Sequence, residues 1–534
     1  MSVPPSASAL VAAAARVAAL REVLQARQRS PVRLAETHLS WVLLTTEHAY
    51  KLKKPLRLPF VDFSTLALRR HFCAEELRLN RRLAPTLYLD VVEVREGAGG
   101  LTFDGDGALL DVAVKMRRFP DGALWSERVA AGELTPHDVD GLALRLADFH
   151  RHCAVAAVAS GFGSTALHER VTLRLVQGLD AAAPSLMADG GWAALRAWAL
   201  ARPALLAPVF EARCRDGRVR ECHGDLHLAN LIEVDGDVTA FDGIEFDPAL
   251  RWIDVLDDVA FVAMDLMAHA HDTLAWRFLD AWFEATGDFD GLPALRFALV
   301  SRALVRAQVA VLSDAQHAAR PGAGEYLALA ARLSTAHDPR LAITHGLPGS
   351  GKSVVSQALS EQAGAVRVRS DVERKRLFGI GALQSSQGRI AGGIYDSAST
   401  QRTYARLLDV ARTALGAGWP VIVDAAFMRA DERRVFAALA EAQRAPFTIV
   451  DCQAPAAVLR DRLARRNARG DDASEADAAV LETLSAVAEP LGEAERACAI
   501  RMDAAVSMPP VALARQWLAA PLCSAGEVAD GCAH

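Results

Sequence analysis

Apolar and polar positions follow one pattern in the N-terminal 338 residues and another in the rest of the chain. The N-terminal part begins with a helical pattern at 11–27 and then shows short apolar runs that favour strands. These predicted strands lie at 41–45, 49–52, 88–94 and 109–117, with a helix at 72–83 and a turn region at 97–107. From residue 136 the periodicity is helical, with helices predicted at 139–151, 166–177, 192–200, 204–214 and within 252–285. This order, strands first and helices afterwards, indicates an α+β domain.

In the C-terminal part, segments of strand type and helix type alternate. Strands are predicted at 341–344, 366–369, 421–424, 447–451 and 499–502. Helices are predicted between them at 354–363, 394–415, 430–443 and 455–467. The alternation predicts an α/β domain whose parallel β-sheet is covered by helices on both faces.

The boundary between the two patterns is marked by a short linker. A helix predicted at 325–336 closes the first pattern, and His337, Asp338 and Pro339 follow it. At 534 residues the chain is too long for a single core. We therefore predict a domain at 1–338, a second at 339–519, and a disordered tail at 520–534.

Three polar side chains stand out between residues 221 and 247. Asp225 follows His223 and Gly224, Asn230 comes five residues later, and Asp242 twelve after that. Phosphoryl transfer needs a carboxylate near the attacking hydroxyl and oxygen ligands that hold Mg²⁺ on the nucleotide phosphates. A hairpin predicted from strands 231–234 and 238–241 would deliver Asp242 to the same cleft as the other two.

The run HGDLHLAN, from His223 to Asn230, resembles the catalytic loop of the aminoglycoside phosphotransferases and related kinase-like small-molecule kinases. The resemblance implies a bilobal protein-kinase-like fold, with a small lobe at about 30–118 and a helical large lobe at about 119–336. It also implies that Asp225 is the catalytic base and that Asn230 and Asp242 bind Mg²⁺. The alternative is a polar hairpin in which these residues serve the turns.

Several acids near this loop stay open between two roles. Either one of Glu245 and Asp247 assists the metal, or both are surface charges. Arg251, Asp254 and Asp258 resemble positions that brace the catalytic loop in the family, but a plain place on a helix face is the alternative for each.

The predicted strand that ends in YKLKKP carries a candidate phosphate-binding lysine. Kinase-like folds hold such a lysine with a glutamate from the following helix. We predict Lys51 and Glu76 for these roles, with Lys53, on the same strand face, and Glu75 as alternatives. A solvated basic edge strand beside an amphipathic helix is the competing interpretation.

One feature of the family is missing before Lys51. The region that would hold a glycine-rich loop contains Thr37, His38 and Ser40 instead. A loop bearing hydroxyl groups could still cover phosphates, so the way this part grips a nucleotide stays open.

The C-terminal part has its own phosphate-binding pattern. GLPGSGKS fits G-x-x-x-x-G-K-[ST] in full, directly after a predicted strand and before a predicted helix. Glycines let backbone N–H groups turn toward phosphate, and the helix N-terminus favours an anion. The predicted nucleotide-binding residues are Gly346, Pro348, Gly349, Ser350, Gly351, Lys352 and Ser353. Lys352 would neutralise the phosphates, and Ser353 would hold Mg²⁺.

Two further strand ends carry acids. Asp424 ends the apolar strand VIVD beside the phosphate loop, which suits a magnesium ligand acting through water. Ser370 and Asp371 end the preceding strand, with Arg374 one helical turn later. This pattern resembles small P-loop kinases of the polynucleotide kinase and zeta-toxin groups, which implies that Asp371 activates a hydroxyl and Arg374 binds substrate. The alternative for Asp371 is a helix N-cap.

The arginine-rich run 460–472 resembles the lid of such kinases. Arg462 and Arg466 are four residues apart, on one helix face, and could stabilise charge on the transferring phosphoryl group. A solvated arginine face is the alternative for either one.

Composition narrows the possible partners. The formal net charge of −6 gives no electrostatic argument for nucleic acid or a membrane surface. The eight cysteines have no metal-like spacing and indicate reduced thiols in a cytoplasm. No apolar run approaches the roughly 20 residues of a membrane span, since the best candidate, 255–270, contains three aspartates.

The whole layout resembles bacterial proteins that fuse an aminoglycoside-phosphotransferase-like domain to a P-loop ATP-binding domain. It implies an enzyme with two ATP–Mg²⁺ sites. The first would phosphorylate a hydroxyl of a small molecule, and the second an acceptor that the sequence leaves open, as it does the oligomeric state. The alternatives are a regulatory protein with a pseudokinase half or an ATPase switch and, more weakly, a kinase of nucleic-acid ends.

Overall fold

The computed structural model describes residues 7–58, 61–98, 100–187, 190–312, 321–386, 394, 396–469, 472–503 and 508–521. Its internal contacts group the chain into two compact units. Among the described residues, the first unit lies within Met1–His168 and Phe210–Asp265, and the second within Glu169–Val209, Leu266–Gln316 and Pro321–His534.

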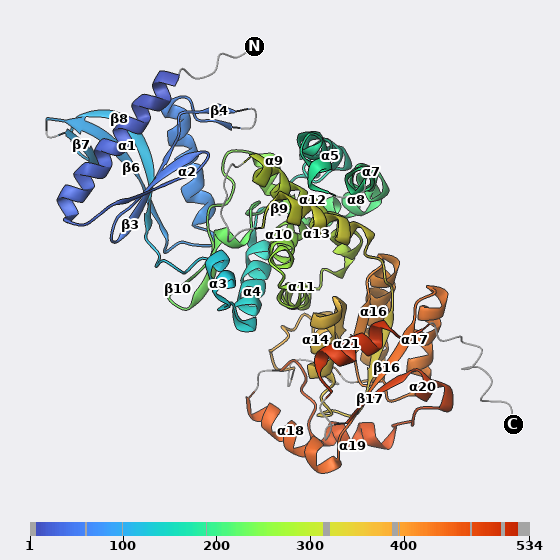
Figure 1. Ribbon diagram of the computed structural model, residues 1–534. Coiled ribbons are helices and arrows are strands. Elements are labelled where there is room, and N and C mark those ends of the chain that lie inside the picture. The colour runs from blue at the N-terminus through green and yellow to red at the C-terminus, as the bar shows by residue number, and fades with distance from the viewer. Residues whose placement is uncertain are drawn as a thin grey trace. The chain divides into compact units, whose positions relative to one another are not determined.

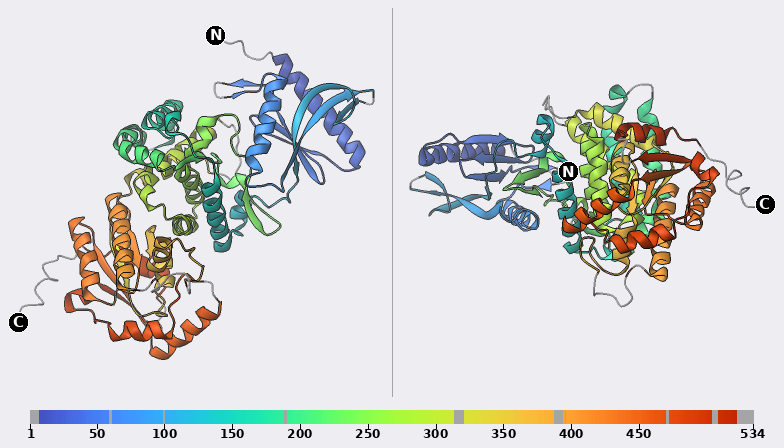
Figure 2. Two further views of the ribbon diagram at one scale, coloured as in Figure 1. Left: turned by 180° about the vertical axis from the view of Figure 1, so that it is seen from behind. Right: turned by 90° about the horizontal axis from the view of Figure 1, so that it is seen from below.

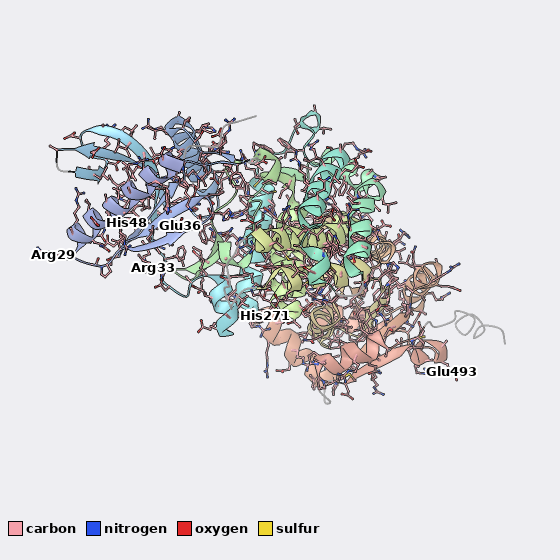
Figure 3. All side chains as sticks on the ribbon, turned by 45° about the horizontal axis from the view of Figure 1, so that its top comes forward. Arg29, Arg33, Glu36, His48, His271 and Glu493 are labelled. Carbon is pink, nitrogen blue, oxygen red and sulfur yellow. The ribbon has the colours of Figure 1, made fainter. Side chains whose placement is uncertain are left out.

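A six-stranded antiparallel sheet forms the N-terminal part of the first unit (Figure 1). In spatial order its strands are β1 (Arg33–Glu36), β2 (Ser40–Leu44), β3 (His48–Lys53), β8 (Ala108–Arg117), β6 (Tyr88–Gly97) and β7 (Gly100–Phe103). Arg33 and Glu36 mark the two ends of β1 in Figure 3. Helix α1 (Ala7–Gln28) packs against one face through Val17 and Leu20.

Helix α2 (Leu66–Asn80) covers the opposite face, where Cys73 packs with Ala49. Successive residues of a strand point to opposite faces. Tyr50 and Leu52 of β3 belong to the cluster under α1, so Lys51 and Lys53 lie on the side of α2. The alternation along one strand therefore brings both lysines toward the same helix.

The rest of the first unit is mostly helical. Its helices include α3 (Trp125–Ala131), α4 (Pro136–His152), α9 (Pro248–Arg251) and α10 (Val255–Ala268). Two small antiparallel pairs accompany them, β10 (Leu231–Val234) with β11 (Asp237–Ala240) and β9 (Val219–Glu221) with β12 (Trp252–Asp254). A two-stranded hairpin, β4 (Arg57–Leu58) with β5 (Val61–Asp62), precedes α2.

A five-stranded parallel sheet forms the centre of the second unit. Its order is β14 (Val366–Arg369), β15 (Val421–Asp424), β13 (Leu341–His345), β16 (Phe447–Gln453) and β17 (Ala499–Asp503). Helices α14 (Lys352–Ala363) and α21 (Pro510–Leu518) pack on one face through Leu359 and Trp517. Helices α16 (Ser397–Gly416) and α17 (Ala430–Ala442) contact the strands as well (Figure 1, Figure 2). The predicted fold class, an α+β kinase-like part and an α/β P-loop part, is confirmed.

Further helices complete the second unit, and some of them precede the predicted boundary at residue 338. They are α5 (Thr165–Leu179), α6 (Ala183–Leu186), α7 (Gly191–Leu205), α11 (Asp272–Thr286), α12 (Leu292–Leu312), α13 (Ala323–Thr335), α15 (Ser370–Leu377), α18 (Ala456–Arg469), α19 (Ala478–Ala486) and α20 (Glu493–Ala497). Trp276 of α11 packs edge-on against Trp419, which leads into β15, with ring centroids 5.5 Å apart. The boundary at 338 stays a prediction, while the contacts place α11 in one compact unit with the parallel sheet.

Some local predictions were wrong. The turn region expected at 97–107 contains β7, which pairs with β6. The helix expected at 204–214 is divided, because α7 ends at Leu205 and α8 (Ala207–Arg215) begins after it. Residues 252–254, expected to be helical, form β12. Residues 522–534 of the predicted tail and Tyr395 of the helix predicted at 394–415 lie outside the described residues.

Cys73, Cys153, Cys214, Cys222 and Cys452 are free thiols, whereas Cys498 is disulfide-bonded, so the prediction of reduced thiols is wrong for Cys498.

In the described part of the chain, no individual helix has both the length and the apolar character that a membrane span requires. By length and composition, only the bent pair of α7 and α8 meets this requirement.

We predict that Trp276→Ala destabilises the second unit. The substitution removes a buried ring that touches Trp419, and such a change typically costs about 3–5 kcal/mol. Leu205→Ala is the control, because this side chain of α7 is 67% exposed and its loss should change the free energy of unfolding by about 0.5 kcal/mol or less. Urea denaturation of both variants measures the difference, and equal midpoints would contradict the packing role of α11.

Candidate functional site

Hydrogen bonds with α10 hold the loop that carries Asp225 in place. Asp258 accepts hydrogen bonds from the backbone amides of His223 and Gly224, both at 2.8 Å, and His150 lies 3.3 Å from the same carboxylate. Burial by itself would raise the pKa of Asp258, but the hydrogen bond and charge of His150 lead the effects that lower it below its usual value. Gly224 has φ +87°, and a Cβ there would lie 2.4 Å from the carbonyl oxygen of Leu250. Asp258 therefore has the bracing position that the resemblance implied.

Asp225 and Asn230 are brought together by this loop. The Asn230 amide donates to the Asp225 carboxylate at 3.1 Å and to its backbone carbonyl at 3.0 Å. Asp265 of α10 accepts from the Leu228 amide at 2.8 Å and fixes the middle of the loop. The Asp225 side chain is 32% exposed, so its carboxylate is accessible from outside the protein.

The β10–β11 hairpin carries Asp242 back to the same loop, as predicted. The amide of Phe241 donates to the Asn230 carbonyl at 3.0 Å. Asp242 follows Phe241 directly, so this hydrogen bond brings its backbone close to Asn230. The amide of Asp242 donates to the Tyr88 hydroxyl at 3.1 Å. The Asp242 carboxylate accepts from the Lys51 ammonium. Tyr88, which sequence reasoning did not single out, therefore helps to hold Asp242.

Glu76 of α2 binds both candidate lysines. Lys51 donates to its Oε1 at 2.9 Å and Lys53 to its Oε2 at 2.6 Å. Glu76 is fully buried; burial by itself would raise its pKa, but the two ammonium groups outweigh burial and lower it. Glu75 pairs instead with Arg78 at 2.9 Å. Since β3 lies between β2 and β8, the alternative of a solvated edge strand is wrong.

Glu245 is a further member of the group of charges around Lys51, Glu76 and Lys53. It is buried and accepts a hydrogen bond from Lys53, so the interpretation of Glu245 as a surface charge is wrong. Asp247 caps α9 by accepting from the Ala249 amide at 2.8 Å. The order Asp242–Lys51–Glu76–Lys53–Glu245 alternates in sign, and this alternation lets five charges share a mostly buried site.

The segment without a glycine-rich loop is a short turn between β1 and β2. The Thr37 amide donates to the Ser40 carbonyl at 2.9 Å, and the Ser40 amide donates to the Thr37 hydroxyl at 3.0 Å. Lys54 donates to the Thr37 carbonyl at 2.6 Å and pairs with Glu36 at 2.7 Å. The hydroxyl of Thr37 therefore closes the turn.

The P-loop has a backbone conformation that several glycines make possible. Gly346 and Gly349 have φ +143° and +82°, and a Cβ at either would lie 2.3 Å and 2.9 Å from the carbonyl oxygens of Cys452 and Leu459. Gly351 has φ +100° and precedes the first residue of α14. The Ser350 hydroxyl is buried and has no hydrogen-bond partner among the described residues. These features fit a phosphate group, which needs backbone N–H and hydroxyl donors.

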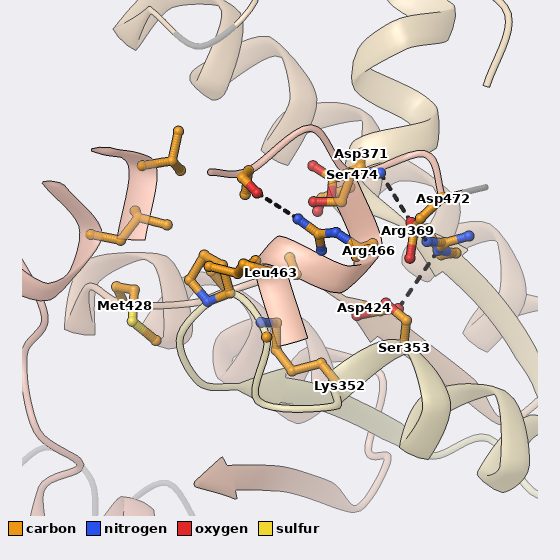
Figure 4. Close-up of a pocket in the computed structure, with 18 of the residues that line it drawn as sticks. Lys352, Ser353, Arg369, Asp371, Asp424, Met428, Leu463, Arg466, Asp472 and Ser474 are labelled. Carbon is orange, nitrogen blue, oxygen red and sulfur yellow. Dashed lines mark hydrogen bonds and ion pairs between the residues drawn. The ribbon is translucent and has the colours of Figure 1, made fainter. Parts of the chain in front are cut away.

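Lys352, Ser353 and Asp424 meet at the end of the parallel sheet (Figure 4). The Lys352 ammonium donates to the Leu347 carbonyl at 3.0 Å, and burial lowers its pKa. Asp424 is buried and accepts from the Ser356 hydroxyl at 3.0 Å. A hydroxyl beside a carboxylate is the donor set that Mg²⁺ prefers, so Ser353 and Asp424 fit the predicted ion.

A cavity of about 610 Å³ opens above these residues. Among the described residues its lining has seven arginines and one lysine against four carboxylates, which favours an anionic ligand. The arginines are Arg369, Arg374, Arg429, Arg462, Arg465, Arg466 and Arg469, and the carboxylates are Asp371, Asp424, Glu432 and Asp472. Pro348, Gly349 and Gly351 line the same cavity.

The four residues predicted for catalysis and substrate binding in the C-terminal part all line this cavity. Asp371 lies in the first turn of α15, whose N-cap is Arg369, so the N-cap alternative for Asp371 is wrong. Arg374 is buried and donates to the Thr400 hydroxyl at 3.2 Å. Arg462 donates to the Gly349 carbonyl at 3.3 Å, and Arg466 donates to the Ala476 carbonyl at 2.7 Å.

Sequence reasoning missed Arg369. It donates to Asp472 at 2.8 Å and lies 3.8 Å from Asp424, between the lid segment and the predicted magnesium ligand. The signal was present in the sequence, because β14 reads VRVR. Arginine at alternate positions of a strand in a parallel sheet needs partners that the strand itself cannot supply.

The chain is similar to known proteins both in its C-terminal part and over most of its length. The family model described as "AAA domain" matches residues 341–491. The uncharacterized proteins Rv2004c of Mycobacterium tuberculosis (strain H37Rv) and Mb2027c of Mycobacterium bovis are each 30% identical over 468 residues, which is 84% of this chain and 89% of each relative.

Solved kinases show weaker likeness. A choline/ethanolamine kinase family protein from Mesorhizobium loti is 11% identical, covers 61% of this chain and 95% of its own, and has a TM-score of 0.35. A gluconokinase from Sinorhizobium meliloti is 21% identical over 34% of this chain and 91% of its own, with a TM-score of 0.24. The match with the mycobacterial proteins covers most of both sequences. The chain therefore belongs to their family, and its match to the AAA domain model lies in the P-loop part.

Proposed function

We propose that this protein is an ATP-dependent phosphotransferase with two separate ATP–Mg²⁺ sites, one in each part. The N-terminal site would phosphorylate a hydroxyl of a small molecule, and the P-loop site a second acceptor. The observation that supports the proposal is that each part contains a lysine, oxygen donors of the kind that Mg²⁺ prefers and a further carboxylate. These are Lys51 with Asn230, Asp242 and Asp225, and Lys352 with Ser353, Asp424 and Asp371.

In the N-terminal site, Asp225 would accept the proton of the attacking hydroxyl. The hydroxyl oxygen forms a bond to the γ-phosphorus while the bond from that phosphorus to the β–γ bridging oxygen breaks, and ADP leaves. Asn230 and Asp242 would hold Mg²⁺, which neutralises phosphate charge. Lys51, oriented by Glu76, would bind the phosphates from the other side.

In the P-loop site the same chemistry would use other groups. Backbone amides of the P-loop and Lys352 would bind the phosphates. Asp371 would take the proton of the acceptor hydroxyl, and Arg374 would bind the acceptor. Arg462 and Arg466, on α18 at the edge of the cavity, would stabilise charge on the transferring group.

One observation favours a second candidate, a regulatory N-terminal part that binds nucleotide without transferring phosphate. The turn between β1 and β2 has no glycine and is closed by its own threonine. The complete set of Asp225, Asn230 and Asp242 favours catalysis, and the predictions below separate the two candidates.

Asp225→Asn should abolish transfer at the N-terminal site without weakening nucleotide binding. The variant keeps the shape of the side chain but cannot accept a proton, so the rate of phosphorylation of a responsive alcohol should fall about 10³-fold. Asp247→Asn, which alters only the cap of α9, is the matched control. An acceptor screen with radiolabelled ATP measures both variants, and unchanged transfer in Asp225→Asn would show that Asp225 is not the base.

Lys352→Ala should remove one of two nucleotide sites. The wild-type chain should bind two equivalents of a non-hydrolysable ATP analogue in calorimetry, and the variant one equivalent. Saturation of the wild-type chain at one equivalent would contradict the proposal of two sites.

Lys51→Ala and Lys53→Ala should have different effects. Loss of Lys51, which reaches both Glu76 and Asp242, should weaken nucleotide binding by the N-terminal part. Loss of Lys53 leaves Glu245 and Glu76 short of a buried partner and should cost about 3–5 kcal/mol of stability. Nucleotide titration and urea denaturation of both variants make the comparison, and the reversed result would assign the phosphate-binding role to Lys53.

A further inference from the structure

Two arginines of β14 are held by one helix outside the predicted P-loop domain. Arg367 donates to Asp280 of α11 at 2.6 Å and to Glu284 at 3.4 Å. Arg369 donates to the other oxygen of Glu284 at 3.0 Å. The side chains of Arg367 and Asp280 are 5% and 6% exposed. Two acids of α11 therefore neutralise two arginines that are largely buried.

The same arginines reach the two predicted magnesium ligands. Arg367 donates to the backbone carbonyl of Ser353 at 3.4 Å. Arg369 lies 3.8 Å from the Asp424 carboxylate, and a dashed line marks this ion pair in Figure 4. One arginine therefore connects each predicted ligand with α11: Arg367 contacts Ser353, and Arg369 lies near Asp424.

This arrangement has a consequence for a divalent cation. A guanidinium stays charged at any ordinary pH, so Arg369 repels the ion and competes with it for Asp424. Glu284 and Asp472 accept hydrogen bonds from Arg369 at 3.0 and 2.8 Å, so these two carboxylates compete with Asp424 for the guanidinium. Asp280 neutralises Arg367, which holds the backbone of Ser353 through its carbonyl.

We propose that Glu284 and Asp280 are positioning residues for the magnesium site of the P-loop part, acting through Arg369 and Arg367. The proposal rests on the function proposed for that site. It adds that the site depends on a helix located before the predicted domain boundary. Groups that hold metal ligands in place typically change metal affinity about 10–100-fold when they are removed.

The test uses the full-length chain with Lys51→Ala, so that the P-loop site dominates nucleotide binding. Mg²⁺ is titrated at a fixed concentration of a fluorescent ADP analogue, with and without Glu284→Gln. The variant should need about tenfold more Mg²⁺ for half-maximal enhancement of binding, while binding without Mg²⁺ stays the same. Asp280→Asn should shift the titration in the same direction.

The matched control is Asp272→Asn. Asp272 is an acid of the same helix that pairs with Arg332 at 2.9 Å, so its loss changes the charge of α11 without touching β14. Equal Mg²⁺ requirements in Glu284→Gln and Asp272→Asn would overturn the proposal. If Glu284→Gln does not fold, Glu284→Asp replaces it: the shorter carboxylate should give a smaller shift in the same direction, and no shift would overturn the proposal.

The starting chain also separates this inference from the function on which it rests. Mg²⁺-dependent binding that Lys352→Ala abolishes supports the P-loop site, and the Glu284 comparison then judges the inference alone. Absence of such binding would overturn both.

Discussion

A fully buried carboxylate held between two ammonium groups organises the N-terminal part. Glu76 accepts from Lys51 on one oxygen and from Lys53 on the other. An ionised group buried alone costs several kcal/mol, so α2 and β3 must stay in register to keep the three charges paired. Lys51 in turn binds Asp242, and Lys53 binds Glu245. The segment with the predicted metal ligand is therefore tied to the sheet through Glu76.

The same constraint governs the P-loop part with different residues. Arginines replace lysines, and their partners come from α11 and from the segment after α18. Backbone geometry adds a second constraint, since Gly346 and Gly349 approach neighbouring carbonyls too closely for any Cβ. In both parts, buried charges that only the correct fold can pair lie close to the predicted ligand-binding residues.

Residues close in sequence were the most predictable. The spacing of Asp225 and Asn230 and the P-loop pattern are local, and their contacts form within a few residues of chain. Alternation along β3 also placed Lys51 and Lys53 on one face, because the period of a strand is two. The match between sequence and structure is therefore best where one element or one loop determines the geometry.

Contacts between distant segments could not be predicted from one sequence. Lys53 and Glu245 are 192 residues apart, and Glu284 and Arg369 are 85 apart. Their pairing depends on how whole elements pack, which neither propensity nor periodicity encodes. The turn closed by Thr37 is similar, since the absent glycines were evident but the hydrogen bonds that replace them were not.

The contacts of α11 also determine how the two sites can be separated experimentally. A fragment that starts at Pro339 has the complete P-loop motif but lacks Asp280, so Arg367 would lose its bidentate partner. Removal of one member of a buried ion pair typically costs about 3–5 kcal/mol, a large share of the stability of a single domain. The fragment would also lack Trp276, which packs on Trp419. Inactivity of such a fragment would reflect lost packing as much as lost chemistry, so point variants in the full-length chain are the sound way to assign activity to either site.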